Sequence, residues 1–323
     1  MTSVHLQESR DRARWDAAAA LGVGRTPFHN WAWLELAAHM CGMRFRPLIA
    51  TAHGRDIGVV PWLARRVGPF TSANRTPFPY VGPLVKHTHL AATLDAMRGF
   101  GRRHRAAMVQ ASFGPEAGLP QVFSAAPFTT KVGYTYVIDE LQDIDAVWAR
   151  LEGRCRTKVR KAKANGVELH EVSSGSSVLG AVVREVFAER GIPVGYRHYF
   201  PPTRADLDTV GMAMRWASAR VSGVEVGSLV TLMDGARAVM WQGGVLPQHR
   251  STQANTLLYW DAIEWASRSG AAAIDLVGSP DDGIDVFKKQ FGGRRVPYLT
   301  LTAEALASRV LGDARRRIRR QSV

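Results

Sequence analysis

The sequence predicts an α/β protein of two domains, each built on a mixed, mostly antiparallel sheet. Segments with helical and strand periodicity alternate along the chain. Its 323 residues exceed one ordinary domain and suit two, and its 46% hydrophobic content is typical of globular proteins. No apolar run approaches the roughly 20 residues that span a bilayer. The segment Met1–Arg14 lacks the apolar core of a secretory signal, so we expect a cytoplasmic location.

The first domain is expected to occupy residues 1–145. Pro27 favours a helix start, and the run His53-Gly54-Arg55-Asp56 predicts a hairpin turn. The many Pro and Gly residues between 69 and 83 predict an irregular loop. In chain order, the other predicted elements are a helix at 28–40, strands at 46–51 and 57–67, a helix at 90–105, and strands at 106–112, 121–125 and 135–138.

The second domain is expected at residues 146–302, followed by a basic helix or tail at 303–323. Asn165-Gly166 and Gly270 tolerate the left-handed conformation that ends helices, and Asp234-Gly235 predicts a tight hairpin. The predicted elements are a helix or helix pair at 145–165, a strand at 167–172, helices at 178–190 and 204–223, strands at 224–233 and 236–245, a helix at 254–269, a strand at 272–277, a short helix at 283–291 and a strand at 297–302.

The charge balance is strongly basic. The 42 Lys and Arg residues against 28 Asp and Glu give a net charge of +14, which attracts nucleic acid, anionic lipid or phosphorylated substrates. The arginine-rich composition that a high-GC genome favours explains the net charge equally well. The positions of the basic residues in the sequence must therefore distinguish the two explanations. Cations cluster at 98–105, at 154–163 and at 315–320. We interpret the last cluster as a solvated helix end.

The middle cluster is the most informative of the three. Its charges cover much of a helix surface, and Glu152 is the one nearby acid, whereas solvated helices usually mix signs. This density favours contacts with the phosphates of RNA or of a diphosphate substrate, and a plain surface helix is the alternative. The predicted anion-binding residues are Arg154, Arg156, Lys158, Arg160, Lys161 and Lys163.

Several chemistries find no support in the sequence. Only Cys41 and Cys155 are present, without paired spacing, which excludes a disulfide framework and a cysteine-based zinc site. The histidines are scattered, with no acid near the pair His87 and His89, so we expect no metal. No Gly-x-Ser-x-Gly motif supports a hydrolase. We therefore expect no bound cofactor.

The second domain has the element order of the GNAT acyltransferase core. There a strand splays from its neighbour, and the following helix points its N-terminal N–H groups into the gap, where they hold an anion or a carbonyl. Acyl-CoA users place a Gln/Arg-x-x-Gly-x-Gly/Ala loop before this helix, so that main-chain N–H groups approach the CoA pyrophosphate. The matching stretch here, residues 248–255, contains Arg250 and no glycine, which argues against such a cradle.

A C-terminal block extends this pattern to a family. The segments at 255–266, Ile274-Asp275-Leu276-Val277-Gly278 and Phe287-Lys288-Lys289-Gln290-Phe291-Gly292 resemble the signature of the Fem-type (FemAB-like) aminoacyltransferases of the GNAT superfamily. The basic segment at 156–167, Pro27-Phe28 with Trp31 and Trp33, and the stretch at 80–84 are similar to further landmarks, so the resemblance spans roughly residues 25–302. It implies two GNAT-like domains that move an amino acid from charged tRNA to a peptidoglycan precursor peptide, or to other acceptors in relatives that serve antibiotic biosynthesis.

The resemblance also implies site residues. Phe287-Lys288 matches a Phe-Lys pair in which the lysine stabilises the reacting carbonyl, and a lysine facing a cleft can indeed act as a fixed cation for an oxyanion. An ordinary exposed charge for Lys288, and a core position for Phe287, are the alternatives. The other implied or candidate substrate-binding residues are Arg197, Tyr196 and Tyr199 in the aromatic loop at 191–202, Trp241 with core packing as its alternative, Arg250 and Asn255.

The function expected from this combination is amide-bond formation. An amine of a peptide or small-molecule acceptor attacks the ester of an aminoacyl-tRNA directly, without a covalent enzyme intermediate. The alternatives are an acyl-CoA-dependent N-acyltransferase and a non-catalytic RNA- or anion-binding module, because a fold does not settle its donor. Contact of the basic chain with an anionic membrane surface stays open.

Overall fold

The computed structural model describes residues 3–76, 78–115, 128–173, 178–189, 203–278 and 281–304. The chain forms two compact units. One contains the residues up to Val132 and, among the described residues, the return segment that starts at Tyr298, and the other contains Gly133–Pro297. The chain leaves the first unit within strand β7 (Thr129–Asp139) and re-enters it within β13 (Arg294–Glu304). The expected division at 145 and 302 differs from these positions, and the predicted tail at 303–323 lies almost wholly outside the described residues.

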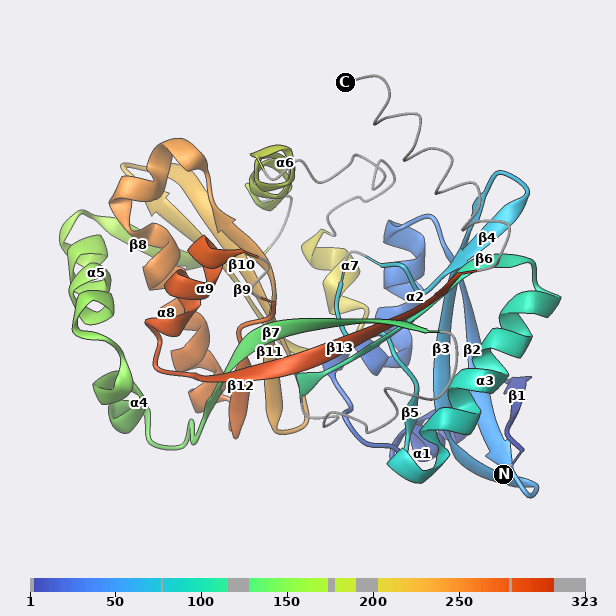
Figure 1. The fold of residues 1–323 in the computed structure, drawn as a ribbon. Helices are drawn as coiled ribbons and strands as arrows, with labels where there is room; N and C mark the ends of the chain where they lie inside the picture. Colours follow the sequence, from blue (N-terminus) through green and yellow to red (C-terminus); the bar gives the residue numbers. More distant parts are fainter. Residues whose placement is uncertain are drawn as a thin grey trace. The chain divides into compact units, whose positions relative to one another are not determined.

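The first unit is a sheet with helices packed against it (Figure 1). Its strands follow the order β1-β2-β3-β4-β6, and the C-terminal half of β13 pairs antiparallel with β6; β4 and β6 are parallel. Helix α3 packs on one face, where Phe100 meets Trp62 edge to face at 4.9 Å between ring centroids. The elements are β1 (His5–Glu8), α1 (Arg12–Ala19), η1 (Pro27–His29), α2 (Trp31–Met40), β2 (Arg44–Ala52), β3 (Arg55–Val67), β4 (Phe70–Ala73), β5 (Leu84–Val85), α3 (His87–Arg103) and β6 (Ala106–Phe113).

One buried histidine joins two segments of the first unit. The Thr26 N–H donates to His29 Nδ1 at 3.2 Å, so the proton lies on Nε2, which donates to the Gly82 carbonyl at 3.1 Å. Burial lowers the pKa of His29 from 6.5 to about 4. The segments around Pro27 and Gly82, both similar to family landmarks, are therefore held together by a neutral imidazole.

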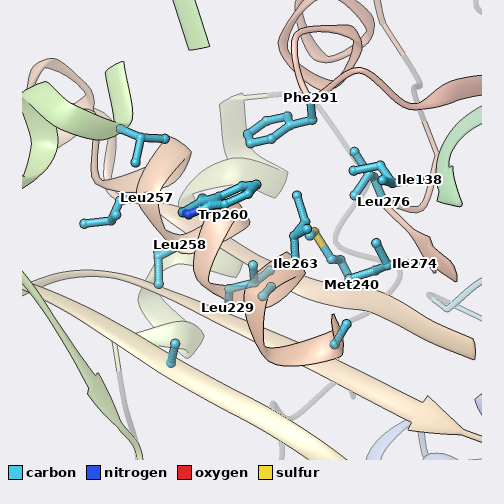
Figure 2. Close-up of a cluster of buried hydrophobic side chains, with 14 of the residues drawn as sticks. Ile138, Leu229, Met240, Leu257, Leu258, Trp260, Ile263, Ile274, Leu276 and Phe291 are labelled. Atoms are coloured by element: carbon cyan, nitrogen blue, oxygen red, sulfur yellow. The ribbon is translucent and has the colours of Figure 1, made fainter. Parts of the chain in front are cut away.

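The second unit has a mixed sheet of order β7-β12-β11-β10-β9-β8, in which β11 and β12 are parallel. Helix α8 packs on β9, β10 and β11, and α5 packs on α8. Figure 2 shows the resulting core, where Trp260 and Ile263 of α8 lie near Met240 of β11 and Phe291. The further elements are α4 (Ile144–Arg150), α5 (Gly153–Ala164), β8 (Val167–Glu171), α6 (Leu179–Glu189), α7 (Arg204–Asp208), β9 (Ala213–Val221), β10 (Val224–Asp234), β11 (Arg237–Val245), η5 (Pro247–Thr252), α8 (Ala254–Arg268), β12 (Ala273–Asp275) and α9 (Asp282–Lys289).

The predicted helix at 204–223 is wrong. Helix α7 ends at Asp208, Gly211 follows with φ +69°, and Ala213–Val221 form strand β9. Both faces of this strand are buried, because Ala217 and Ala219 face α8 while Trp216 packs on the opposite side. A strand buried on both faces loses the polar–apolar alternation that identifies strands in a sequence.

Five shorter elements also escaped prediction. Strand β4 lies within the stretch expected to be an irregular loop, and β5 follows that stretch. The elements β1 and α1 precede the first predicted helix, and η5 lies between the predicted strand at 236–245 and the predicted helix at 254–269. The predicted strand at 121–125 falls outside the described residues. The remaining predicted helices and strands are present, with ends shifted by a few residues.

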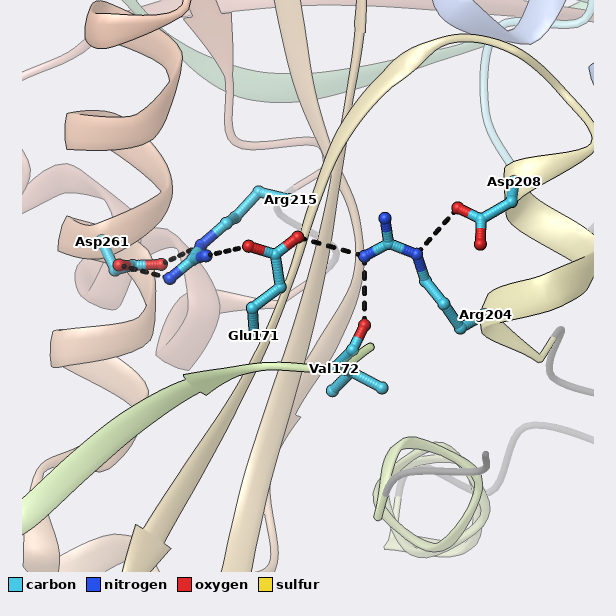
Figure 3. A network of polar contacts seen from close by, with 6 residues as sticks. All are labelled: Glu171, Val172, Arg204, Asp208, Arg215 and Asp261. Carbon is cyan, nitrogen blue, oxygen red and sulfur yellow. Dashed lines mark hydrogen bonds and ion pairs between the residues drawn. The ribbon is translucent and has the colours of Figure 1, made fainter. Parts of the chain in front are cut away.

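A chain of alternating charges fixes the β8 edge of the second unit (Figure 3). Asp261 of α8 accepts two hydrogen bonds from Arg215 of β9, whose guanidinium also reaches Glu171 of β8 at 3.0 Å. Glu171 then pairs with Arg204 of α7 at 3.2 Å, and Arg204 pairs with Asp208 at 2.9 Å. Arg215 and Asp261 are mostly buried, so this network ties α7 to the core through bidentate geometry.

Candidate functional site

The parallel strands β11 and β12 separate soon after they pair. Their register joins three residue pairs, the last being Val239 and Asp275, where β12 ends. Strand β11 continues to Val245 and contains a bulge at Trp241, because Val230 pairs with Gln242 while Thr231 pairs with Met240. Beyond β12 the chain stays with β7, since the Leu276 N–H donates to the Tyr136 carbonyl at 2.9 Å. The second unit therefore contains the expected splay.

A strained turn follows β12 at the splay. Val277 has φ +54°, a left-handed conformation that a β-branched residue rarely adopts. The buried carboxylate of Asp275 holds this turn, because its Oδ1 accepts the Val277 N–H at 2.7 Å and the Thr135 hydroxyl at 2.5 Å. A strained residue held by buried polar groups is a feature that clusters at functional sites.

Lys288 fixes the same turn from helix α9. Its side chain is buried, with 6% of the residue exposed, and its Nζ donates to the Gly278 carbonyl at 2.6 Å and to the Val277 carbonyl. The interpretation as an ordinary exposed helix charge is therefore wrong for Lys288, whereas Lys289 beside it is exposed. The structure brings a lysine, a buried carboxylate and a strained turn together at the place where the strands diverge.

Helix α9 is held in place by aromatic and charged contacts. Phe287 meets Tyr259 at 5.0 Å and Phe291 at 5.4 Å between ring centroids, so it has the core-type packing that the sequence left open. On another side, Asp285 accepts a hydrogen bond from the Tyr136 hydroxyl at 3.0 Å and one from Arg295 at 3.2 Å. Burial, and then the bond to Asp285, raise the pKa of Tyr136. These contacts restrict the motion of the segment that contains Lys288.

The N-terminus of α8 is closed by its own preceding turn. Gln253 adopts a left-handed conformation at φ +63°, and the Thr252 hydroxyl accepts the Ala254 N–H at 3.3 Å. Ala254 is fully buried. Arg250, in the same turn, forms an exposed ion pair with Glu189 at 2.5 Å. The Oδ1 atom of Asn255 is buried and has no hydrogen-bond partner among the described residues.

The predicted basic residues of α5 fall into two groups. Arg156 donates to the Ala149 and Leu151 carbonyls at the end of α4, and Lys158 donates to Gln290 at 3.2 Å, so both make internal contacts. The other four are exposed on α5: Arg154 pairs with Glu152, Arg160 lies over the Trp148 ring at 5.7 Å, and Lys161 and Lys163 face outward.

The remaining predicted site residues divide as follows. Trp241 lies in the β11 bulge and is buried, with 8% exposed. Arg197, Tyr196 and Tyr199 lie outside the described residues. Within the part of the chain that the structure describes, no group of three or more His, Cys, Asp or Glu side chains is arranged to hold a metal, and no helix has the length and apolar character to cross a bilayer.

The sequence analysis did not predict the hydrogen bonds that hold the strained turn and helix α9. Asp275 lies two residues before Val277, the spacing of an Asx-turn, which is a usable local signal. Thr135 is 140 positions away from Asp275 and carries no such signal. Asp285 and Tyr136 escaped for the same reason, because their contact joins α9 to a distant strand.

Comparisons with known proteins agree with this geometry. Residues 149–289 match the family described as acetyltransferase (GNAT) domain. The fold is similar to the crystal structure of FemX, at 13% identity over 91% of this chain and 96% of that chain, with a TM-score of 0.63. Comparison with curated protein sequences found no match.

Two further solved structures have the same fold at TM-score 0.54. One is the C-terminal domain of a putative lysylphosphatidylglycerol synthetase from Agrobacterium fabrum, at 14% identity over 94% of this chain and 95% of that chain. The other is a tandem GNAT protein from the clavulanic acid biosynthesis pathway, at 13% identity over 94% and 98%. Residues 149–289 therefore match a GNAT-type acetyltransferase domain, and the chain shares its fold with these solved structures. Its likeness to the Fem-type fold, predicted from the sequence, is confirmed.

Proposed function

We propose that this acyltransferase moves an aminoacyl group from aminoacyl-tRNA to the amine of a peptide or small-molecule acceptor. The amine nitrogen attacks the ester carbonyl, a C–N bond forms, and the bond to the ribose oxygen breaks. The proton that leaves the nitrogen ends on that ribose oxygen, so atoms and charge balance without a covalent enzyme intermediate. The protein positions both substrates and stabilises the oxyanion. Charged tRNA is cytoplasmic, so the proposal places the reaction there.

One observation favours aminoacyl-tRNA over acyl-CoA as the donor. It is the N-terminus of α8, which the preceding turn closes. A CoA pyrophosphate needs main-chain N–H groups that it can approach closely, usually through glycines. Here the turn before the helix has no glycine, Thr252 already accepts the buried Ala254 N–H, and Arg250 pairs with Glu189. A donor whose phosphates bind elsewhere suits this turn better. The exposed cations of α5 supply such a place.

Lys288 supports the chemical step in this proposal. Its ammonium is held beside the turn that follows β12, in the splay where GNAT-type enzymes react. Because it is fixed before the substrate arrives, its charge stabilises a developing oxyanion without reorganisation. The unpaired Oδ1 of Asn255 then accepts an N–H of the substrate. Phe287, Trp241 and Arg250, with Arg197, Tyr196 and Tyr199, remain the proposed substrate contacts.

One structural neighbour supports an aminoacyl group over other acyl groups. A lysylphosphatidylglycerol synthetase is named for a product that carries an amino acid, and its domain shares this fold. The neighbour from the clavulanic acid biosynthesis pathway agrees with service in antibiotic biosynthesis. The resemblance to the Fem-type family implies service in peptidoglycan synthesis. The choice of acceptor stays open between these two.

Donor binding tests the proposal directly. We expect the full chain to retain charged tRNA saturably in filter binding and to give no saturable heat with acetyl-CoA in calorimetry. Amide formation is then measured as transfer of labelled amino acid from total aminoacyl-tRNA to a peptidoglycan precursor peptide and to free diamines. Saturable acetyl-CoA binding without tRNA retention would instead establish the acyl-CoA alternative, which the description of the matched domain as an acetyltransferase favours.

The non-catalytic alternative predicts a different result. A binding module on a transferase scaffold would retain tRNA but transfer no amino acid, and binding would be lost through changes in α5 while Lys288→Ala had no effect. We expect the reverse for an enzyme, with transfer lost in Lys288→Ala and tRNA retention kept.

A further inference from the structure

A second basic surface lies in the first unit, at the end of helix α3. It consists of five exposed arginines contributed by different elements, and we call it the α3-end surface. Its members are Arg44, Arg66, Arg102, Arg103 and Arg105.

The topology of the sheet brings these arginines to one end of the unit. Arg44 lies at the start of β2, and Arg66 lies near the end of the antiparallel strand β3, on the same face. Thr71 of β4 pairs with Arg66, and its N–H donates to the Arg105 carbonyl at 3.1 Å, just before β6. The last turn of α3, which contains Arg102 and Arg103, ends over the same face. Three of the five members thus come from the basic run at 98–105, and the strand register adds Arg44 and Arg66 to them.

The Phe100 ring makes cation–π contacts with two arginines at this end of the unit. The guanidinium of Arg46 lies 4.8 Å from the centroid of the buried Phe100 ring and that of Arg103 lies 5.8 Å from it. The His104 ring packs on the same ring at 4.3 Å, and its Nε2 lies 3.1 Å from Arg46. Within the described part of the chain, Glu8 is the carboxylate that pairs with this group, through Arg46 at 2.9 Å.

The charges on this surface are therefore largely uncompensated. Burial, then Arg46 and Arg103, lower the pKa of His104; Glu8 raises it, and Arg44 lowers it least. Like charges held this close repel one another, which a bound polyanion relieves. Arginine suits phosphate in particular, since its planar fork donates two parallel hydrogen bonds.

We infer that the α3-end surface binds the phosphodiester backbone of RNA, as a second contact for the tRNA donor. The inference rests on the proposed function for the identity of the RNA. Separate arginines on β2, β3, α3 and the turn before β6 match the repeated phosphates of a nucleic-acid strand. An anionic membrane fits less well, because Phe70 is the one exposed large apolar side chain among those the structure describes on these strands, and membrane insertion needs a wider apolar face.

The test uses the full chain and uncharged total tRNA in filter binding over a series of KCl concentrations. The variant Arg66→Gln/Arg102→Gln removes two arginines from the surface. The matched control Arg10→Gln/Arg55→Gln removes two exposed arginines from elsewhere in the same unit. We expect the first variant to bind about 10- to 100-fold more weakly at low salt, and its plot of log affinity against log salt to flatten by about two. The control should stay within about twofold of the parent chain.

Three outcomes would overturn the inference. They are equal losses in both variants, no loss in either, and unchanged tRNA binding with lost binding to phosphatidylglycerol vesicles. Thermal unfolding of each variant verifies that the exposed substitutions leave the fold intact. The proposed function fails separately. If the parent chain transfers no amino acid while the surface variant still loses tRNA, the surface stands without the reaction. If transfer is normal and both variants behave alike, the surface fails and the reaction stands.

Discussion

The two units contain the same local arrangement, a strand, a long helix and a parallel strand, yet they use it differently. In the first unit β4, α3 and β6 form it, and in the second β11, α8 and β12. After β4 the buried Asn74 extends the pairing with β3, because its side chain accepts the Leu63 N–H at 2.7 Å and donates to the Pro61 carbonyl at 2.8 Å. After β12 the gap is bounded by a strained valine and a buried lysine.

This difference distinguishes buried polar groups that stabilise the fold from buried polar groups that can take part in a reaction. In the first unit the buried polar side chains Asn74 and His29 are matched by main-chain partners, as structural groups are. In the second unit the buried charge of Lys288 lies against two carbonyls. Burying a charge is costly, and such groups persist where a ligand or a reaction uses them. The reacting centre is therefore expected in the second unit.

The largest effect on aminoacyl transfer is expected from a substitution at Lys288 in the second unit. The substitution Lys288→Met removes the fixed charge, and we expect aminoacyl transfer to fall about 100- to 1,000-fold in single-turnover assays. The matched control Lys289→Met changes an exposed neighbour and should keep transfer within about twofold. Thermal unfolding of both variants separates lost chemistry from lost structure. Full transfer by a folded Lys288→Met chain would end the proposed role.

A pH experiment tests the structural role of the buried His29 in the first unit. Because the pKa of His29 is about 4 in the fold and 6.5 when exposed, the unfolded chain binds more protons between these values. The contribution of His29 is fully present above pH 6.5 and declines as pH falls toward 4. The loss amounts to about 3 kcal/mol of unfolding free energy at most. Urea unfolding from pH 7 to 4.5 measures it.

His29→Gln is the control for that experiment. It should unfold more easily at pH 7, since its geometry differs from that of the imidazole, but its stability should depend less on pH. An equally steep dependence in the variant would assign the acid sensitivity to other groups.

A smaller effect is expected at the strained turn. Val277→Gly relieves a left-handed conformation that costs an L-residue about 1–2 kcal/mol, while glycine gives back part of this through the entropy of the unfolded chain. We expect the free energy of unfolding to rise by about 1 kcal/mol or less. Transfer should slow, because the carbonyls that position Lys288 become less fixed. A variant that is both less stable and fully active would contradict the assignment of strain to function.

The smallest effect is expected at Arg250. Its ion pair with Glu189 is exposed, so Arg250→Gln should change the free energy of unfolding by less than about 1 kcal/mol in urea. Glu189→Gln is the matched control and should give a similar value. A much larger loss in either would mean that this pair restrains the turn before α8 more than its exposure suggests.

Local signals predicted most of the second unit, and non-local ones escaped. Asp234-Gly235 located the β10–β11 hairpin, and the glycine that follows α8 located its end. The strand at 213–221 was missed because both of its faces are buried, so its pattern resembles that of a helix. The sequence singled out Lys288 as a candidate site residue, but it did not predict the partners of this lysine. No local pattern indicates that its side chain contacts a carbonyl ten residues earlier.

The path of the chain through the first unit has a consequence for synthesis on the ribosome. Strand β6 acquires its antiparallel neighbour from Leu299–Glu304, which are translated after the whole of the second unit. The first unit begins to emerge early but is completed last, with the edge of β6 waiting unpaired for its partner. Chains truncated at residue 298 and released from the ribosome should therefore contain a finished second unit attached to an unfinished first one, the stage at which exposed strand edges favour aggregation.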